Sequence, residues 1–221
     1  MTGLEDFRPG IRKQVRASAK KTETWVRPGR ESVGVGRVLA FDQSLGATGF
    51  VAIQHVDGVL EVRQALTLRG VAAQDLSSHA KTLAEFLDLE HKLVETLLPY
   101  VVSGQSWEVA YEAPPMDTAG MRRSESSLLA AAALISAARA VDLPVLPYVA
   151  AQHHRKVIAG RTTFKQPGEI TLTPIQAKAR YHADLRATAE SVGLDMHLVT
   201  NEGQRDATAI GLTVLLDRGP R

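Results

Sequence analysis

Two apolar runs that meet at an acidic turn constrain the fold of this chain more than any other feature. Residues 38–41 and 48–54 are predominantly apolar, and Asp42 and Gly46 lie in the short segment between them. Apolar runs of this length, bounded by turn residues, are typical of buried strands. A carboxylate at the mouth of such a turn, followed by small and hydroxyl residues, suits a hard metal ion or a phosphate better than a core.

The pattern after this hairpin alternates between strands and helices. A third strand is expected after the turn at Asp57-Gly58. The predicted elements are strands at 38–41, 48–54, 59–68, 107–112 and 144–148, helices at 76–102, 124–141, 150–159, 174–192 and 204–216, and a strand or turn at 197–199. Gly160 and Pro174 mark the end and the start of helices on either side of a loop at 161–173. This order predicts one mixed α/β layer architecture.

The composition of the chain limits the classes of protein to which it can belong. With 221 residues the chain can form one generous domain, predicted at 37–221, preceded by a basic and flexible arm at 1–36 that is interrupted by proline and glycine. There is no cysteine, which excludes disulfides and thiolate metal sites. No run of 18 apolar residues and no secretory signal occur, so the chain is expected to be soluble and cytoplasmic, without a membrane partner.

Basic residues gather in two places although the formal net charge is only +2. One is the region 155–178, and the other is the arm, with Arg8, Arg12, Lys13, Arg16, Lys20, Lys21, Arg27 and Arg30. Such an asymmetry is expected of a protein that lies along a phosphate backbone. A basic tail and a loop that are merely solvated would show the same pattern.

Three carboxylates fall where strands end or where the last helix begins: Asp42, Glu112 and Asp206. If the first and fourth strands are parallel neighbours, Asp42 and Glu112 emerge at the same edge of the sheet. Two negative charges at so short a distance repel each other unless a cation lies between them. Asp206 would complete a site of hard oxygen ligands for Mg²⁺ or Mn²⁺.

Each acid, taken singly, could also have a purely structural role. Asp42 could close a turn, Glu112 could pair with an arginine, and Asp206 could be a surface residue of its helix. Glu202 precedes Asp206 by four residues, about 40° away around a helix, and could add a fourth carboxylate. It could equally be a first-turn acid favoured by the helix dipole. The joint occurrence of the three acids favours a site.

With these motifs, the chain resembles the RuvC-like Holliday junction resolvases of the RNase H-like superfamily over most of residues 37–217. The resemblance rests on Asp42-Gln-Ser-Leu-Gly-Ala-Thr-Gly49, the strand ending in Glu112, and the helix that begins Arg205-Asp-Ala-Thr-Ala-Ile-Gly211. A further segment, Tyr148 to Gly160, is similar to a family segment that contributes to DNA contact. The resemblance implies an RNase H-like mixed five-stranded sheet with helices on both faces.

The resemblance also implies an activity, a cofactor and partners. It implies a homodimeric endodeoxyribonuclease of DNA recombination and repair, which nicks four-way or other branched DNA symmetrically with two Mg²⁺ or Mn²⁺ ions. Asp42 and Glu112 would hold one ion, and Asp42 and Asp206, with Glu202, the other. Arg155, Lys156, Lys165 and Lys178 become candidates for phosphate contact. Pro115 and Met116 stand where the family places a side chain that wedges into the junction.

Several residues depart from the family pattern. Ser44 stands where the turn commonly has glycine, and Gly203 stands where another Asp or a His is common, so that Glu202 is a substitute ligand. The loop after Gly160 is long, and the arm has no counterpart in the bacterial enzymes. These departures indicate a divergent member and are compatible with a phage source.

Three other functions stay open. They are a branched-DNA-binding module without activity, a YqgF-like RNA-processing nuclease, and one lobe of an actin-like or sugar-kinase ATPase, which would need about twice this length. The seven histidines, among them the adjacent His153 and His154, show no spacing typical of a helical zinc site. We therefore expect none of them to be a structural metal ligand. Trp107 is expected in the core. Trp25 either stacks on a nucleic-acid base or has no role.

Overall fold

The structure is a computed structural model of the chain, and it describes residues 25–70, 78–112, 125–147, 149–161 and 172–219. The strands are β1 (Gly36–Asp42), β2 (Ala47–Val56), β3 (Val59–Arg69) and β4 (Glu108–Tyr111). The helices are η1 (Arg30–Ser32, a 3₁₀ helix), α1 (Ser78–Val102), α2 (Glu125–Ala140), α3 (Ala151–Ala159), α4 (Pro174–Val192) and α5 (Glu202–Arg218). Every predicted helix is confirmed, with ends displaced by a few residues.

The sheet is mixed, with strand order β3-β2-β1-β4. β1 pairs antiparallel with β2, and β2 with β3, whereas β1 and β4 are parallel with Phe41 opposite Tyr111. The predicted strand at 144–148 is represented in the described residues by isolated parallel bridges, Val145 to Val109 and Val149 to Glu112. The mixed α/β sheet is therefore confirmed with four strands, and a fifth full strand is absent from the described part of the chain.

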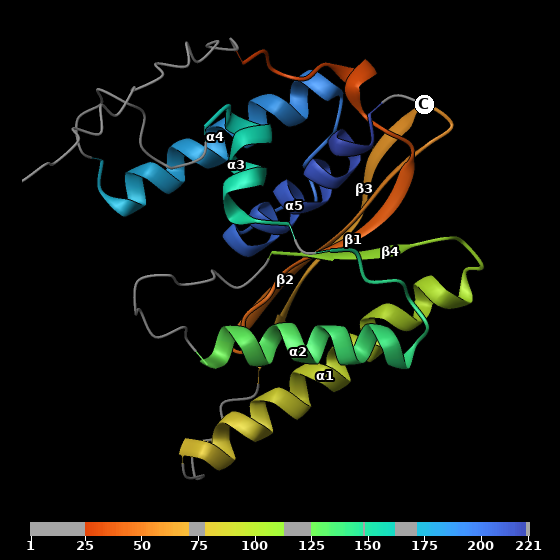
Figure 1. Ribbon diagram of the computed structural model, residues 1–221, viewed down its shortest axis with the longest axis vertical. Helices are drawn as coiled ribbons and strands as arrows, with labels where there is room; N and C mark the ends of the chain where they lie inside the picture. Colours follow the sequence, from red (N-terminus) through yellow and green to blue (C-terminus); the bar gives the residue numbers. More distant parts are fainter. Residues whose placement is uncertain (1–24, 71–77, 113–124, 148, 162–171, 220–221) are drawn as a thin grey trace, which may run out of the picture.

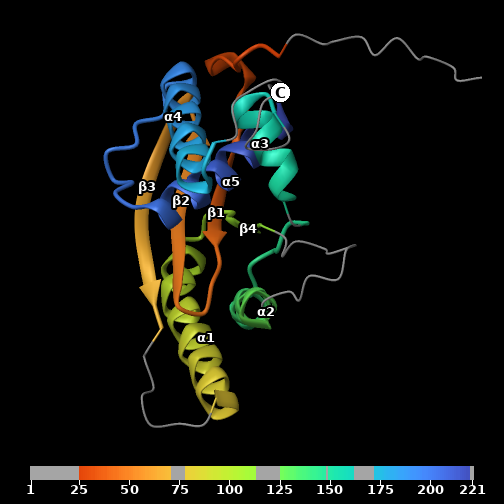
Figure 2. The same ribbon diagram turned by 90° about the vertical axis from the view of Figure 1, so that its left-hand side faces the viewer.

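Helices cover both faces of the sheet, with α1 and α2 on one side and α3, α4 and α5 on the other (Figures 1 and 2). The alternation of β1 explains this arrangement. Leu39 and Phe41 pack with leucines of α1 and alanines of α2, whereas Val38 and Ala40 pack with α4 and α5. Because successive side chains of a strand point to opposite faces, an apolar run buries both faces at once.

Two glycines allow α5 to lie close against the sheet. A Cβ at Gly211 would lie 3.0 Å from both Ala40 Cβ and Ile53 Cδ1. Near the start of α5, a Cβ at Gly49 of β2 would overlap the carbonyl group of Gly203 and lie 2.9 Å from the Gln204 nitrogen. The backbone of α5 therefore lies directly on β1 and β2, which fixes the height of Asp206 above the sheet.

Local signals explain where the helices begin and end. Thr173 and Gln176 form a capping box ahead of Pro174, and Gly160 and Gly193 end α3 and α4 in the left-handed conformation. α1 contains Pro99 and ends at Val102, as predicted. Residues 197–199 form a turn. Among the described helices, none is long and apolar enough to span a membrane.

The end of the predicted arm, residues 25–36, lies against the domain. The indole of Trp25 packs over Gly160, and Ser191 Oγ donates a hydrogen bond to the Pro28 carbonyl at 2.8 Å. Val33 is buried in the core beside α4 and α5, and the Gly34 nitrogen donates to the Leu215 carbonyl. A flexible arm stays a prediction for residues 1–24, which lie outside the described part.

The contact between Gly49 and Gly203 predicts an asymmetric effect of two Gly→Ala changes. Gly49→Ala should lower the free energy of unfolding by about 2–3 kcal/mol, because the added methyl meets backbone that cannot rotate away. Gly203→Ala is the matched control, since its Cβ would have Gly49 Cα as its nearest neighbour at 3.4 Å. It should be neutral or stabilising by up to about 1 kcal/mol. Chemical denaturation measures both, and equal effects would contradict the packing.

Candidate active site

The carboxyl ends of β1 and β4 bring the first two predicted acids together. Asp42 is the last residue of β1, and Glu112 directly follows β4 in the parallel register. Gln43 Nε2 donates a hydrogen bond to the Glu112 carbonyl at 2.5 Å. This bond ties the end of β1 to the end of β4, so the two acids stay at the same edge of the sheet.

The turn after Asp42 is closed by hydroxyl groups. Thr48 Oγ1 donates to the Ser44 carbonyl at 2.8 Å and accepts from the Ser44 nitrogen at 3.2 Å. Ser44 Oγ in turn accepts from the Ala47 nitrogen at 3.1 Å. Ser44, the departure from the glycine of the family pattern, therefore stabilises the turn through its side chain.

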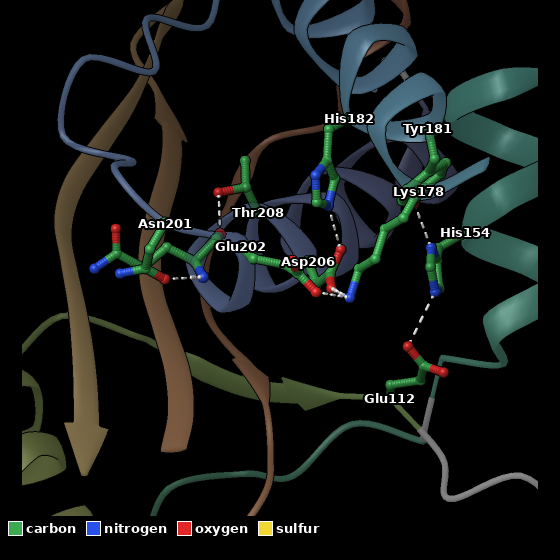
Figure 3. Close-up of polar contacts among 10 residues, drawn as sticks. Glu112, His154, Lys178, Tyr181, His182, Asn201, Glu202, Asp206 and Thr208 are labelled. Atoms are coloured by element: carbon green, nitrogen blue, oxygen red, sulfur yellow. Dashed lines mark hydrogen bonds and ion pairs between the residues drawn. The ribbon is translucent and has the colours of Figure 1, made fainter. Parts of the chain in front are cut away.

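Polar contacts with β3 fix the start of α5. The Asn201 side chain caps the helix by accepting from the Gln204 nitrogen at 3.1 Å, and its Nδ2 donates to Thr67 Oγ1 at 2.8 Å. Gln204 Oε1 accepts from the Thr200 nitrogen at 2.8 Å. These bonds hold the first turn of α5, which carries Glu202 and leads to Asp206 (Figure 3).

Both carboxylate oxygens of Asp206 receive a partner from α4. His182 Nε2 donates to Oδ1 at 2.9 Å, and the Lys178 ammonium lies 3.1 Å from Oδ2 (Figure 3). Burial disfavours the charged carboxylate, but the hydrogen bond from His182 and the charge and hydrogen bond of Lys178 outweigh it, so the pKa of Asp206 is lowered. Asp206 is therefore a carboxylate at neutral pH.

Lys178 also forms an ion pair with Glu202. Burial disfavours its ammonium form, but hydrogen bonds to Glu202 and Asp206, together with their charges, raise the pKa of Lys178 above its ordinary value. One lysine thus neutralises part of the charge of two of the four predicted acids.

Glu112 is held by a buried chain of two further side chains. His154 Nε2 lies 3.1 Å from Glu112 Oε2, and His154 Nδ1 lies 2.5 Å from the Tyr181 hydroxyl (Figure 3). Burial and the charges of nearby acids raise the pKa of Tyr181 well above its ordinary value, so its hydroxyl stays protonated and donates to Nδ1. This leaves Nε2 as the donor to Glu112, and the ring orients the carboxylate.

Asp42, at the end of β1, has no hydrogen-bond or ion-pair partner among the described residues. Burial, followed by the charges of Asp206, Glu112 and Glu202, raises the pKa of Asp42 to about 7, against a smaller opposite effect of Lys178. The other three predicted acids therefore each act electrostatically on Asp42. Asp42 is the group whose charge is least compensated.

The donor set fits a hard divalent cation. Its oxygen atoms come from carboxylates, which are the ligands that Mg²⁺ and Mn²⁺ prefer. Among the described residues, however, no three acidic or imidazole side chains stand close enough to hold an ion together. The Lys178 ammonium takes the cation position between Asp206 and Glu202 instead.

The predicted DNA contacts, which comprise the phosphate-contacting cations and the wedge residues, divide into three groups. Lys156 is exposed on α3, next to the half-buried Arg155. Lys178 points into the acidic cluster. Lys165, Pro115 and Met116 lie outside the described residues, so their predicted roles stay predictions.

A groove of about 930 Å³ lies beside Glu202, between α4 and the segment that leads into α5. Its lining includes Lys178, His182 and Glu202 from the site, and it extends to Arg186 and Arg205. The groove carries both charges, because Glu190 and Asp195 line it as well.

The sequence interpretation missed the roles of His154, Tyr181, His182 and Asn201. The histidines show no zinc-type spacing, but His154 contacts Glu112 and His182 contacts Asp206. One signal was present: His182 lies four residues after Lys178, on the same face of a helix. Trp107 is buried in the core as predicted.

Comparison with known proteins gives likenesses in structure alone. No family model matches the sequence, and no curated protein resembles it significantly. Thermus thermophilus RuvC has a similar fold, with a TM-score of 0.55 and 15% identity, covering 82% of this chain and 94% of that one. T. thermophilus RuvC in complex with a Holliday junction substrate gives a TM-score of 0.55 and 14% identity, covering 84% and 99%.

A eukaryotic protein has the same fold. The yeast mitochondrial Holliday junction resolvase gives a TM-score of 0.50 and 9% identity, covering 84% of this chain and 82% of that one. None of these likenesses supports a phage source. The chain therefore has the fold of T. thermophilus RuvC and of the yeast mitochondrial Holliday junction resolvase.

Proposed function

We propose that this chain is a metal-dependent endodeoxyribonuclease that resolves four-way or other branched DNA by phosphodiester hydrolysis. One observation carries the proposal: a half-buried carboxylate, Asp42, has only partial charge compensation beside three further carboxylates on a RuvC-like fold. A structural core gains nothing from such a cluster, because burying like charges together is unfavourable. A site that receives a dication and a phosphate requires it.

Some residues of the chain would bind the metal ions, and others would orient the carboxylates that do so. Asp42 and Glu112 would hold one Mg²⁺ or Mn²⁺ ion, and Asp42 and Asp206, with Glu202, a second. When bound, such ions activate water and stabilise the charge that develops on the phosphodiester and its leaving oxygen. His154 would keep the Glu112 carboxylate oriented, and His182 would do the same for Asp206.

DNA contact would come from the cationic side chains around the acids. Arg155 and Lys156 on α3, together with Lys165, are the proposed phosphate contacts on one side, and Pro115 and Met116 would face the centre of the junction. Arg186 and Arg205 in the groove would extend this surface. Phosphate contacts position the strand, and the branched shape supplies the selectivity.

We also propose a homodimer, because symmetric nicks in a four-way junction require two sites. The apolar side chains of Leu83 and Leu87 on α1 and Leu128 on α2 are more than two-fifths exposed, and α1 and α2 lie on the face of the sheet opposite α3–α5 (Figure 2). An exposed apolar strip of this kind suits packing against a second copy.

The inactive DNA-binding alternative would be favoured by an Asp206 that faces solvent away from Asp42. The Asp206 side chain is instead only 14% exposed, and its charge raises the pKa of Asp42. This supports a catalytic site. An RNA-processing role is tested by including structured RNA beside four-way junctions and flaps in the cleavage assay.

Three substitutions test the catalytic assignment. Asp42→Asn, Glu112→Gln and Asp206→Asn should each lower the rate of Mg²⁺-dependent junction cleavage by at least about a hundredfold, because each removes an anionic ligand. Junction binding in Ca²⁺, measured by gel mobility shift, should change little. Glu95→Gln, an exposed acid on α1, is the control and should cleave like the wild type. Wild-type cleavage by one of the three variants at saturating metal would remove that residue from the site.

The pKa of Asp42 predicts a gain in stability on removing its charge. A pKa of about 7 in the folded protein, against an ordinary value of 3.8, means that wild-type stability falls as the pH rises from about 4 through about 7. In EDTA at pH 8, Asp42→Asn should therefore increase the free energy of unfolding by about 2–4 kcal/mol, with no increase below pH 4. Saturating Mg²⁺ should reduce the difference. If the difference in the free energy of unfolding between the two proteins is the same at every pH, the charge of Asp42 does not destabilise the fold.

A truncation tests the arm. Deleting residues 1–24 should weaken junction binding and make its salt dependence shallower, because six basic residues are lost and counterion release scales with phosphate contacts. The cut stops before Trp25, since that residue packs on Gly160. Fluorescence anisotropy at several salt concentrations gives the slope of the logarithm of the affinity against the logarithm of the salt concentration. If this slope and the affinity are both unchanged, the arm does not contact DNA.

A further inference from the structure

We propose that Lys178 is a built-in counter-ion that occupies the cation position of the site until a divalent metal displaces it. The inference rests on the proposed function, because it requires that the acids bind metal. It assigns Lys178 a role in controlling metal occupancy that differs from a phosphate contact at the surface.

The contacts of Asp206 carry the first step. One oxygen, Oδ1, accepts from His182 at 2.9 Å, and the other, Oδ2, faces the Lys178 ammonium at 3.1 Å. The same ammonium pairs with Glu202. Lys178 therefore bridges two carboxylates, as a divalent ion would, and an ion that binds Oδ2 at coordination distance must take its place.

The two partners of Asp206 differ in mobility. Lys178 and His182 are four residues apart on the same face of α4. The His182 side chain is 11% exposed, whereas that of Lys178 is 36% exposed and has four rotatable carbon bonds. His182 can thus stay as the partner that orients Asp206 while Lys178 moves.

The groove beside the site offers the displaced ammonium a destination. Lys178 borders this groove together with Arg186 and Arg205. A lysine released from two carboxylates exchanges its partners for solvent or for an anion such as a DNA phosphate. Metal binding would therefore free the Lys178 ammonium to contact the phosphate backbone of the DNA substrate.

The test is the Mn²⁺ affinity of the full chain without DNA, measured by electron paramagnetic resonance at low ionic strength. Lys178→Met keeps the length of the side chain and removes its charge, so Mn²⁺ should bind about tenfold more tightly than to the wild type. Lys178→Arg keeps the charge and should bind Mn²⁺ like the wild type. Lys81→Met is the control, because Lys81 pairs with Glu85 on α1, on the other face of the sheet.

Thermal melting supplies a second readout and a check on folding. In EDTA, Lys178→Met should melt at a lower temperature than the wild type, since the acids lose their counter-ion, and Mn²⁺ should remove the deficit. Equal or weaker Mn²⁺ affinity in Lys178→Met would overturn the role of Lys178. If neither the variants nor the wild type binds Mn²⁺ at millimolar concentration, the proposed metal site itself is wrong.

Discussion

Mutual repulsion among four carboxylates is the interaction around which the rest of this structure is organised. Parallel pairing of β1 with β4 brings Asp42 and Glu112 to one edge, and α5 adds Glu202 and Asp206. The fold compensates this charge in part, with His154 on Glu112 and with His182 and Lys178 on Asp206. Asp42 stays the least compensated of the four, as a binding site selected at the expense of stability would be.

Packing holds the acids together against this repulsion. The absence of a side chain at Gly49 lets the start of α5 touch β2, and hydrogen bonds from Asn201 and Gln204 hold it to Thr67 of β3. Gln43 links the ends of β1 and β4. Because each acid sits at the end of a strand or in the first turns of a helix, rigid elements set its position and water can still reach the edge.

Local pattern predicted much of this arrangement from the sequence. Apolar runs gave the strands, the alternation within β1 buries both sheet faces, and acids at strand ends indicated a shared edge. The histidine contacts were beyond such reasoning, because His154 and Glu112 are 42 residues apart and His182 and Asp206 are 24 apart. The orientation of Lys178 was likewise unpredictable, since it depends on how α4 docks against α5. The packing of residues 25–36 depends on contacts of the same long-range kind, such as that between Ser191 and Pro28.

Diffraction from crystals soaked in Mn²⁺ shows directly whether these acids bind metal. We expect anomalous density within about 2.0–2.3 Å of a carboxylate oxygen of Asp42. We also expect Glu112 or Asp206 to share the ion and the Lys178 ammonium to have moved away from Asp206. Saturating Mn²⁺ that leaves Asp42 without an ion, with Lys178 still bridging Asp206 and Glu202, would contradict the assignment of these acids as a metal-dependent phosphodiesterase site.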